Sequence, residues 1–258
     1  MVTNSLVISG PDDALERIIR LLTTAAPDRL LAETREIPYA SVWADFTPWR
    51  AVPEPAVISA TLDGQLTDIG LAVLSRGGAD HLRLKQGRDP FLSEMPPEYG
   101  ETAHTLLVKL GLEKLTGEDL HSVAEGRVPG CLDAGRRAIA AYEATGEFGW
   151  YDWRKRHWGV RAFGAELRVS SLPDGSVRLR FDSVNDCPVP LIRAILNAEP
   201  GVQLSGAAID EDAGFAVLLA SDGPDLLSTQ TDEGTEMRRA HEIVYGCAPE
   251  PDEDGPEP

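Results

Sequence analysis

The run AELRVSSLPDGSVRLRF, residues 165–181, decides the fold of this chain. Apolar and charged side chains alternate over 165–169 and again over 177–181, on either side of the turn signal Pro173-Asp174-Gly175. Alternation with a period of two is typical of strands with one buried face, and a turn containing Asp-Gly between two such runs is typical of a hairpin. The run therefore predicts a β-hairpin.

Elements with simple patterns lie on both sides of this hairpin. Upstream, a strand over 6–9 is followed by an amphipathic helix that begins at Pro11. Downstream, the apolar spacing predicts a helix, two strands and a last helix, over 188–196, 202–209, 215–219 and 235–245. Without the long segment between the first helix and the hairpin, the order is β-α-β-β-α-β. We therefore predict an α+β fold, a ferredoxin-like split βαβ antiparallel sheet interrupted by a long, mostly helical insert.

The insert itself combines several patterns. Its proline-rich start, 38–60, predicts irregular structure, and the apolar run 69–74 fits either a helix or a strand. Strands are predicted over 57–62 and 81–84, and helices over 102–115, from 116 onward and over 132–142. The predicted organisation is the first strand and helix over 1–26, the insert over 27–158, the remaining ferredoxin-like part over 159–246, and a disordered acidic tail over 247–258.

The charge balance limits the classes of partner. The chain has 258 residues, 42% of them hydrophobic, with 24 basic and 42 acidic side chains and a formal net charge of -18. Such a balance disfavours binding to nucleic-acid phosphate and favours either plain solubility or a basic partner. No apolar run of about 18 residues predicts a membrane span, and the three separated cysteines predict neither a zinc site nor a disulfide framework. We expect a cytoplasmic protein without a membrane partner.

The run WYDWRKRHWG, residues 150–159, holds three of the five tryptophans and a basic cluster. The simpler interpretation is a helix end packed into the core, with Trp153 and Trp158 mainly structural. The alternative is a stacking platform for nucleic acid, because aromatic rings mixed with cations bind bases and phosphates. The candidate binding residues are Trp150, Trp153, Arg154, Lys155, Arg156, His157, Trp158 and Arg161.

Other candidate sites give weaker patterns. Asp182 and Asp186, at a strand end, fit acid–base chemistry or a cation, but turn and capping chemistry explains them as well. Cys187 has no histidine placed by sequence to activate it. The five histidines show no metal-ligand spacing, and no phosphate-binding glycine motif occurs. We expect no catalytic residue, no metal and no cofactor.

Four motifs resemble the YubB-type ferredoxin-like domain family of phage- and plasmid-borne proteins. They are NSLVISG at 4–10, FLSEMPPE at 91–98, WYDWRKRHWG at 150–159, and Phe181-Asp182-Ser183 followed by Pro188 and Pro190. The family continues with Thr-Lys-Trp after the Trp-Gly pair, where this chain has Val160, Arg161 and Ala162. The resemblance implies a ferredoxin-like domain and supplies no reaction.

Three functional hypotheses follow from these observations. The leading one is a non-enzymatic protein-binding or interaction protein of mobile-element origin, whose partner is a basic or a nucleic-acid-binding protein. The second is a nucleic-acid-binding module that uses the basic tryptophan segment 150–168. The third is a small enzyme with an acidic site near Asp182.

Overall fold

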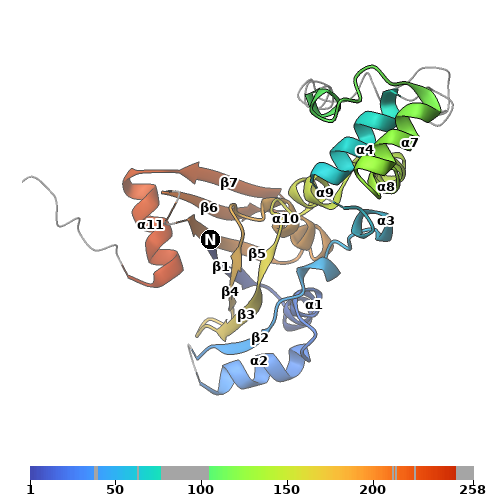
Figure 1. Ribbon diagram of the computed structural model, residues 1–258. Coiled ribbons are helices and arrows are strands. Elements are labelled where there is room, and N and C mark those ends of the chain that lie inside the picture. The colour runs from blue at the N-terminus through green and yellow to red at the C-terminus, as the bar shows by residue number, and fades with distance from the viewer. Residues whose placement is uncertain are drawn as a thin grey trace, which may run out of the picture. The chain divides into compact units, whose positions relative to one another are not determined.

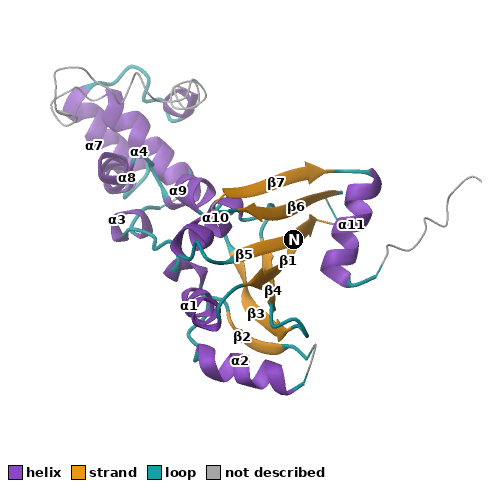
Figure 2. Ribbon diagram, turned by 180° about the vertical axis from the view of Figure 1, so that it is seen from behind, coloured by secondary structure: helices purple, strands orange, loops and turns teal. Residues whose placement is uncertain are grey.

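A computed structural model describes residues 1–37, 40–62, 64–76, 105–210, 212, 214–223 and 225–247. The chain divides into two compact units (Figure 1). The sheet unit consists of Met1–Pro53 and Arg154–Pro258, and the helical unit consists of Glu54–Trp153. Every strand that carries a label in Figure 2 belongs to the sheet unit. No helix within the described ranges is long and apolar enough to cross a membrane.

The sheet unit contains a seven-stranded sheet in which every neighbouring pair is antiparallel, in the order β2-β3-β4-β1-β5-β6-β7. The strands are β1 (Val2–Ser9), β2 (Val42–Asp45), β3 (Phe163–Ser171), β4 (Val177–Ser183), β5 (Gln203–Asp210), β6 (Phe215–Asp222) and β7 (Asp225–Thr231). The helices of this unit are α1 (Asp12–Leu22), α2 (Pro27–Glu36), the 3-10 turn η1 (Pro48–Arg50), α10 (Val189–Ala198) and α11 (Gly234–Tyr245). The class is therefore α+β.

The predicted hairpin is present, because β3 pairs with β4 on either side of the Asp-Gly turn. Leu167 lies opposite Phe181 and Val169 opposite Leu179, and all four side chains are buried. On the same face, Thr34 of α2 shares a 2.6 Å hydrogen bond with Ser171. The period-two alternation thus directs the apolar side chains of the hairpin to the core and its charged side chains to the opposite face.

The opposite face of the sheet is covered in part by α11 (Figure 1). Ala240 and Val244 of α11 pack on Ala207, Ile209 and Ala216 of β5 and β6. Helices α1 and α10 lie on the other side of the sheet, and each directs an apolar stripe into the core. The strand between the two halves of the sheet is β1, whose Leu6 lies opposite Leu179 of β4 and Gly206 of β5.

The helical unit is built around two helices that cross very closely. Its elements are α3 (Ala56–Ser59), α4 (Gln65–Arg76), α7 (Gly117–Arg127), α8 (Cys131–Thr145) and the start of α9 (Trp150–His157). A Cβ added to Gly70 of α4 would lie 2.7 Å from the backbone nitrogen of Gly135 in α8, so only glycine permits this approach. Ile69, Val73 and Leu120 are among the buried side chains around the crossing.

Several predictions need correction. Residues 57–62 do not form a strand, because α3 begins directly after Pro55 and contains the first part of this apolar run. β2 lies inside the region predicted to be irregular, and β7 was not predicted. The predicted insert, 27–158, stays a prediction; the helical unit is Glu54–Trp153, and β2 pairs with β3 in the sheet unit. The predicted strand 81–84, the start of helix 102–115 and the tail from 248 lie outside the described residues.

Candidate functional site

Two tryptophans of the basic segment are structural. Trp153 and Trp158 each retain only 4% exposure. The Nε1 of Trp158 donates a 2.9 Å hydrogen bond to the carbonyl of Val52, and its ring lies 5.9 Å from that of Phe163. Gly159 then ends α9 at φ +83°, where a Cβ would meet Pro190 at 2.6 Å. These two rings are unavailable for stacking on a ligand in this fold, as the simpler sequence interpretation expected.

The cations of the segment have separate surroundings. The guanidinium of Arg154 lies over the Trp158 ring at 5.0 Å and donates to the carbonyl of Arg161. Lys155 lies 3.4 Å from the carboxylate of Asp186. Arg156 and Arg161 are exposed, whereas His157 and Trp150 are half-buried. A binding role for these cations stays a prediction, now without the two buried rings.

The carboxylates of Asp186 and Asp182, at the strand end, accept hydrogen bonds from nearby groups of the protein. Asp186 accepts a 2.8 Å hydrogen bond from the backbone N–H of Cys187, and Asp182 accepts one of 3.1 Å from Thr3. Burial, followed by the nearby charge of Asp186, raises the pKa of the Cys187 thiol to about 12. This thiol is therefore protonated at neutral pH and is a poor nucleophile. No cluster of three metal-binding side chains occurs in the described part of the chain.

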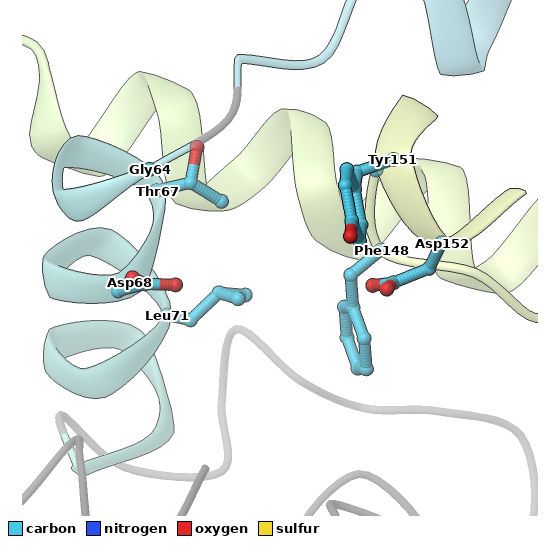
Figure 3. A pocket seen from close by; sticks show the side chains of 8 residues that line it. Gly64, Thr67, Asp68, Leu71, Phe148, Tyr151 and Asp152 are labelled. Atoms are coloured by element: carbon cyan, nitrogen blue, oxygen red, sulfur yellow. The ribbon is translucent and has the colours of Figure 1, made fainter. Parts of the chain in front are cut away.

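A pocket of about 290 Å³ opens in the helical unit (Figure 3). The start of α4 forms one wall, and the junction between α8 and α9 forms the other. The lining residues are Gly64, Thr67, Asp68, Leu71, Phe148, Gly149, Tyr151 and Asp152. We call this space the Asp68 pocket.

Local sequence chemistry builds both walls of the Asp68 pocket. Gly64, at φ +94°, makes the turn into α4, and the Thr67 hydroxyl donates to the carbonyl of Leu62. Gly146, at φ +81°, ends α8, after which Phe148 stacks on Tyr142 with ring centres 4.3 Å apart. One hydrogen bond connects the segments beside the two walls. The backbone N–H of Trp150 donates to the Thr61 hydroxyl at 3.1 Å, which helps to hold the walls at their separation.

The Asp68 pocket is acidic and aromatic. Figure 3 shows the carboxylates of Asp68 and Asp152 directed toward each other across the space, with the Phe148 and Tyr151 rings beside Asp152. Burial raises the pKa of the Asp68 carboxyl above its ordinary value. The carboxylate of Asp68 has no hydrogen bond or ion pair with any described residue, and no described lysine, arginine or histidine lines the space.

This arrangement permits two kinds of chemistry. A carboxyl group with a raised pKa beside a second carboxylate is the pattern of an acid–base pair. Two carboxylates with exposed ring surface are equally the pattern that binds an ammonium or guanidinium group. Among the described lining residues, Thr67 and Tyr151 carry hydroxyl groups, and none is a cysteine, serine or histidine.

Sequence reasoning placed Asp152 inside the candidate segment but missed Asp68. Asp152 was visible as the acidic residue among the cations of 150–159. Asp68 lies in the start of a helix that the sequence left ambiguous, and the docking of α4 beside the α8–α9 junction brings the two carboxylates together. No local pattern in the sequence predicts that α4 lies beside the α8–α9 junction.

Comparisons with known proteins give a weak likeness only. No family model matches the chain, and no curated protein matches it. Among solved structures, the chain is similar to a protein described as api92 from Yersinia pseudotuberculosis and as belonging to the family model DUF1281. The TM-score is 0.34 and the identity 13%, over 90% of this chain and 98% of that one. A likeness at this level supports no functional argument.

Proposed function

We propose that this protein is a non-enzymatic binding protein whose partner is a basic protein that inserts an arginine or lysine side chain into the Asp68 pocket. One observation carries the proposal. The partly buried carboxylate of Asp68 faces Asp152 across an open space and has no cationic partner among the described residues.

The energetics favour a cation in that space. Burial disfavours the ionised form of Asp68, and a cation that enters the pocket offsets that cost by pairing with the carboxylate. The Tyr151 ring, which is 43% exposed, adds an aromatic surface to the cation site. A volume of about 290 Å³ is at the lower limit for ligand pockets, which suits one side chain better than a large cofactor. The net charge of -18 attracts basic partners from a distance.

The test is calorimetric titration of the whole chain with a short blocked peptide that contains one arginine between glycines. The matched peptide carries citrulline, which has the same shape as arginine without the charge. We expect saturable binding of the arginine peptide and none of the citrulline peptide. Asp68→Asn should weaken binding roughly tenfold or more, because hydrogen bonds to charged groups contribute about 1.5–3 kcal/mol.

The control is Glu143→Gln, which removes the same charge from an exposed position on α8. It should bind the arginine peptide as the parent chain does. Equal loss in both variants would mean that only the net charge matters, and the pocket proposal would be abandoned. Equal binding of arginine and citrulline peptides would have the same consequence.

The finer fold assignment is also a proposal. We infer a ferredoxin-like arrangement of β1, α1, β3, β4, α10 and β5, which is supported by the spatial order β3-β4-β1-β5 of the strands. In this order the hairpin lies on one side of β1 and the last of the four strands on the other. Kinship with the YubB-type family, and with it a mobile-element origin, rests on the four sequence motifs. Nucleic-acid binding by segment 150–168 has less support, because Trp153 and Trp158 are buried.

A further inference from the structure

Three arginines share the part of the sheet surface formed by β3 and β4, on the face opposite the hairpin core. Arg168 of β3 lies directly opposite Arg180 of β4, and Trp43 of β2 lies directly opposite Arg168. Arg178 follows on the same face, two residues before Arg180 on the same strand. We call this surface the arginine face.

The arginines of this face repel one another. Like charges directly opposite on neighbouring strands destabilise a sheet. Burial, followed by the charge of Arg168, lowers the pKa of Arg180, and Arg178 adds to the effect. None of the three guanidinium groups forms an ion pair with a carboxylate in the described ranges. The fold therefore gathers positive charge here without neutralising it by direct contact.

Two buried polar atoms on the same face lack a partner. The Nε of Arg178 is buried and forms no hydrogen bond with a described residue. Ser5, which lies opposite Arg180 on β1, is fully buried, and its hydroxyl has no hydrogen-bond partner in the described part of the chain either. Buried polar groups are nearly always hydrogen-bonded in folded proteins. An anion bound at Arg168 and Arg180 would relieve the repulsion between these two side chains.

An exposed ring completes the arginine face. Trp43 is 51% exposed, and the guanidinium of Arg168 stacks on it at 3.8 Å. Together they form a flat aromatic and cationic surface of the kind on which nucleic-acid bases stack. A hollow of about 140 Å³ lies beside them and is lined by Thr3, Trp43, Arg168 and Arg180 with Phe181, Glu166 and Asp182.

The charged neighbours limit the ligand. Glu166 and Asp182 face the same hollow, and Asp182 accepts a hydrogen bond from Thr3. Tyr245 of α11 borders Arg180, with the guanidinium 6.0 Å from the ring centre. Two carboxylates beside three arginines repel the closely spaced phosphates of a duplex. A ligand that brings one phosphate for each base that stacks fits better.

We propose that the arginine face binds a nucleoside phosphate unit, with the phosphate on Arg168 and Arg180 and the base against Trp43. This site lies in the sheet unit and does not depend on the Asp68 pocket. The unit is supplied either by a free mononucleotide or by a single strand of nucleic acid, because both present the same phosphate and base.

The test uses the whole chain at about 50 mM salt and three probes: inorganic phosphate, thymidine monophosphate and an oligothymidylate of about eight nucleotides. Tryptophan fluorescence and calorimetry report binding. We expect thymidine monophosphate to bind more tightly than phosphate, and Trp43→Leu to abolish that difference. Tighter binding of the oligonucleotide identifies a strand as the source, and equal binding identifies a mononucleotide.

The variants Arg168→Gln and Arg180→Gln separate binding from structure. Each should weaken thymidine monophosphate binding roughly tenfold, while the thermal midpoint stays level or rises because like-charge repulsion is relieved. Arg136→Gln, an equal charge change at an exposed site on α8, should have no effect on binding. A fall in the thermal midpoint with unchanged binding would overturn the proposal, as would an equal loss in Arg136→Gln or a failure of all three probes to bind.

Discussion

Gly70→Ala tests the closest packing contact in the helical unit. A Cβ on Gly70 would lie 2.7 Å from the nitrogen and 2.9 Å from the Cα of Gly135, and it would overlap the carbonyl oxygen of Cys131. All of these are backbone atoms of α8, so no side chain can rotate away and the two helices must separate. Overpacking of this kind costs about 1–3 kcal/mol.

The matched substitution is Gly126→Ala, in α7 of the same unit. A Cβ there meets no atom of the described residues within 4 Å. Alanine in a helix interior is favoured over glycine by about 0.5–1 kcal/mol, so this variant should be more stable than the parent chain. Both changes carry the same gain in helix propensity. The difference between the two variants therefore isolates the contact cost, about 1–3 kcal/mol.

The assay is urea unfolding of the whole chain, followed by circular dichroism. Gly70→Ala should have a lower midpoint than Gly126→Ala by roughly 1 M, for an m value of about 1–3 kcal/mol/M. If Gly70→Ala is as stable as Gly126→Ala, then α4 and α8 do not cross at these glycines. The packing of the helical unit, and with it one wall of the Asp68 pocket, would then be wrong.

Two further predictions concern titratable groups. Burial holds the pKa of Asp68 above its ordinary value, so affinity for the arginine peptide should rise as pH increases through that raised pKa and then level off. Asp68→Asn should show no such rise. Calorimetry at several pH values measures the effect, and pH-independent binding by the parent chain would contradict it. The same raised pKa means that the chain loses some stability as pH rises through it, a loss that Asp68→Asn removes. Burial raises the pKa of Cys187 to about 12, so iodoacetamide at about pH 8 should label exposed Cys247 and leave Cys187 unlabelled until the chain is denatured. Native labelling of Cys187 at the rate of Cys247, read by mass spectrometry, would refute its burial.

Local patterns predicted much of the sheet unit. The hairpin, α10, β5, β6 and α11 are each encoded by a periodicity and a turn within a few residues, so no knowledge of the rest of the chain is needed. β7 escaped because most of its side chains are exposed, which leaves little apolar alternation to detect. β2 was not predicted because it has only four residues and lies in a proline-rich region. It forms a strand because β3 supplies its hydrogen-bonding partner.

Neither candidate site could be predicted from short stretches of sequence, and the physical reason is the same for both. Trp43 and Arg168 lie far apart along the chain, and the register of β2 on β3 alone makes them neighbours. Asp68 and Asp152 meet because α4 docks beside the α8–α9 junction. Each residue was unremarkable in its own segment. Pairing between distant segments is set by the summed packing of the whole unit, which a short window of sequence does not contain.

The central place of β1 has a consequence for synthesis of the chain. β1 is made before both of its neighbours in the sheet, β4 and β5, and β5 ends at Asp210. At about 5–20 residues per second, a ribosome needs roughly 10–40 s to go from one to the other. Until β4 is complete at Ser183, Val2, Leu6 and Ile8 have no strand to pair with, whereas Glu54–Trp153 have already been synthesised. The order of folding should therefore invert the order of the chain, with the helical unit formed before the strand that precedes it.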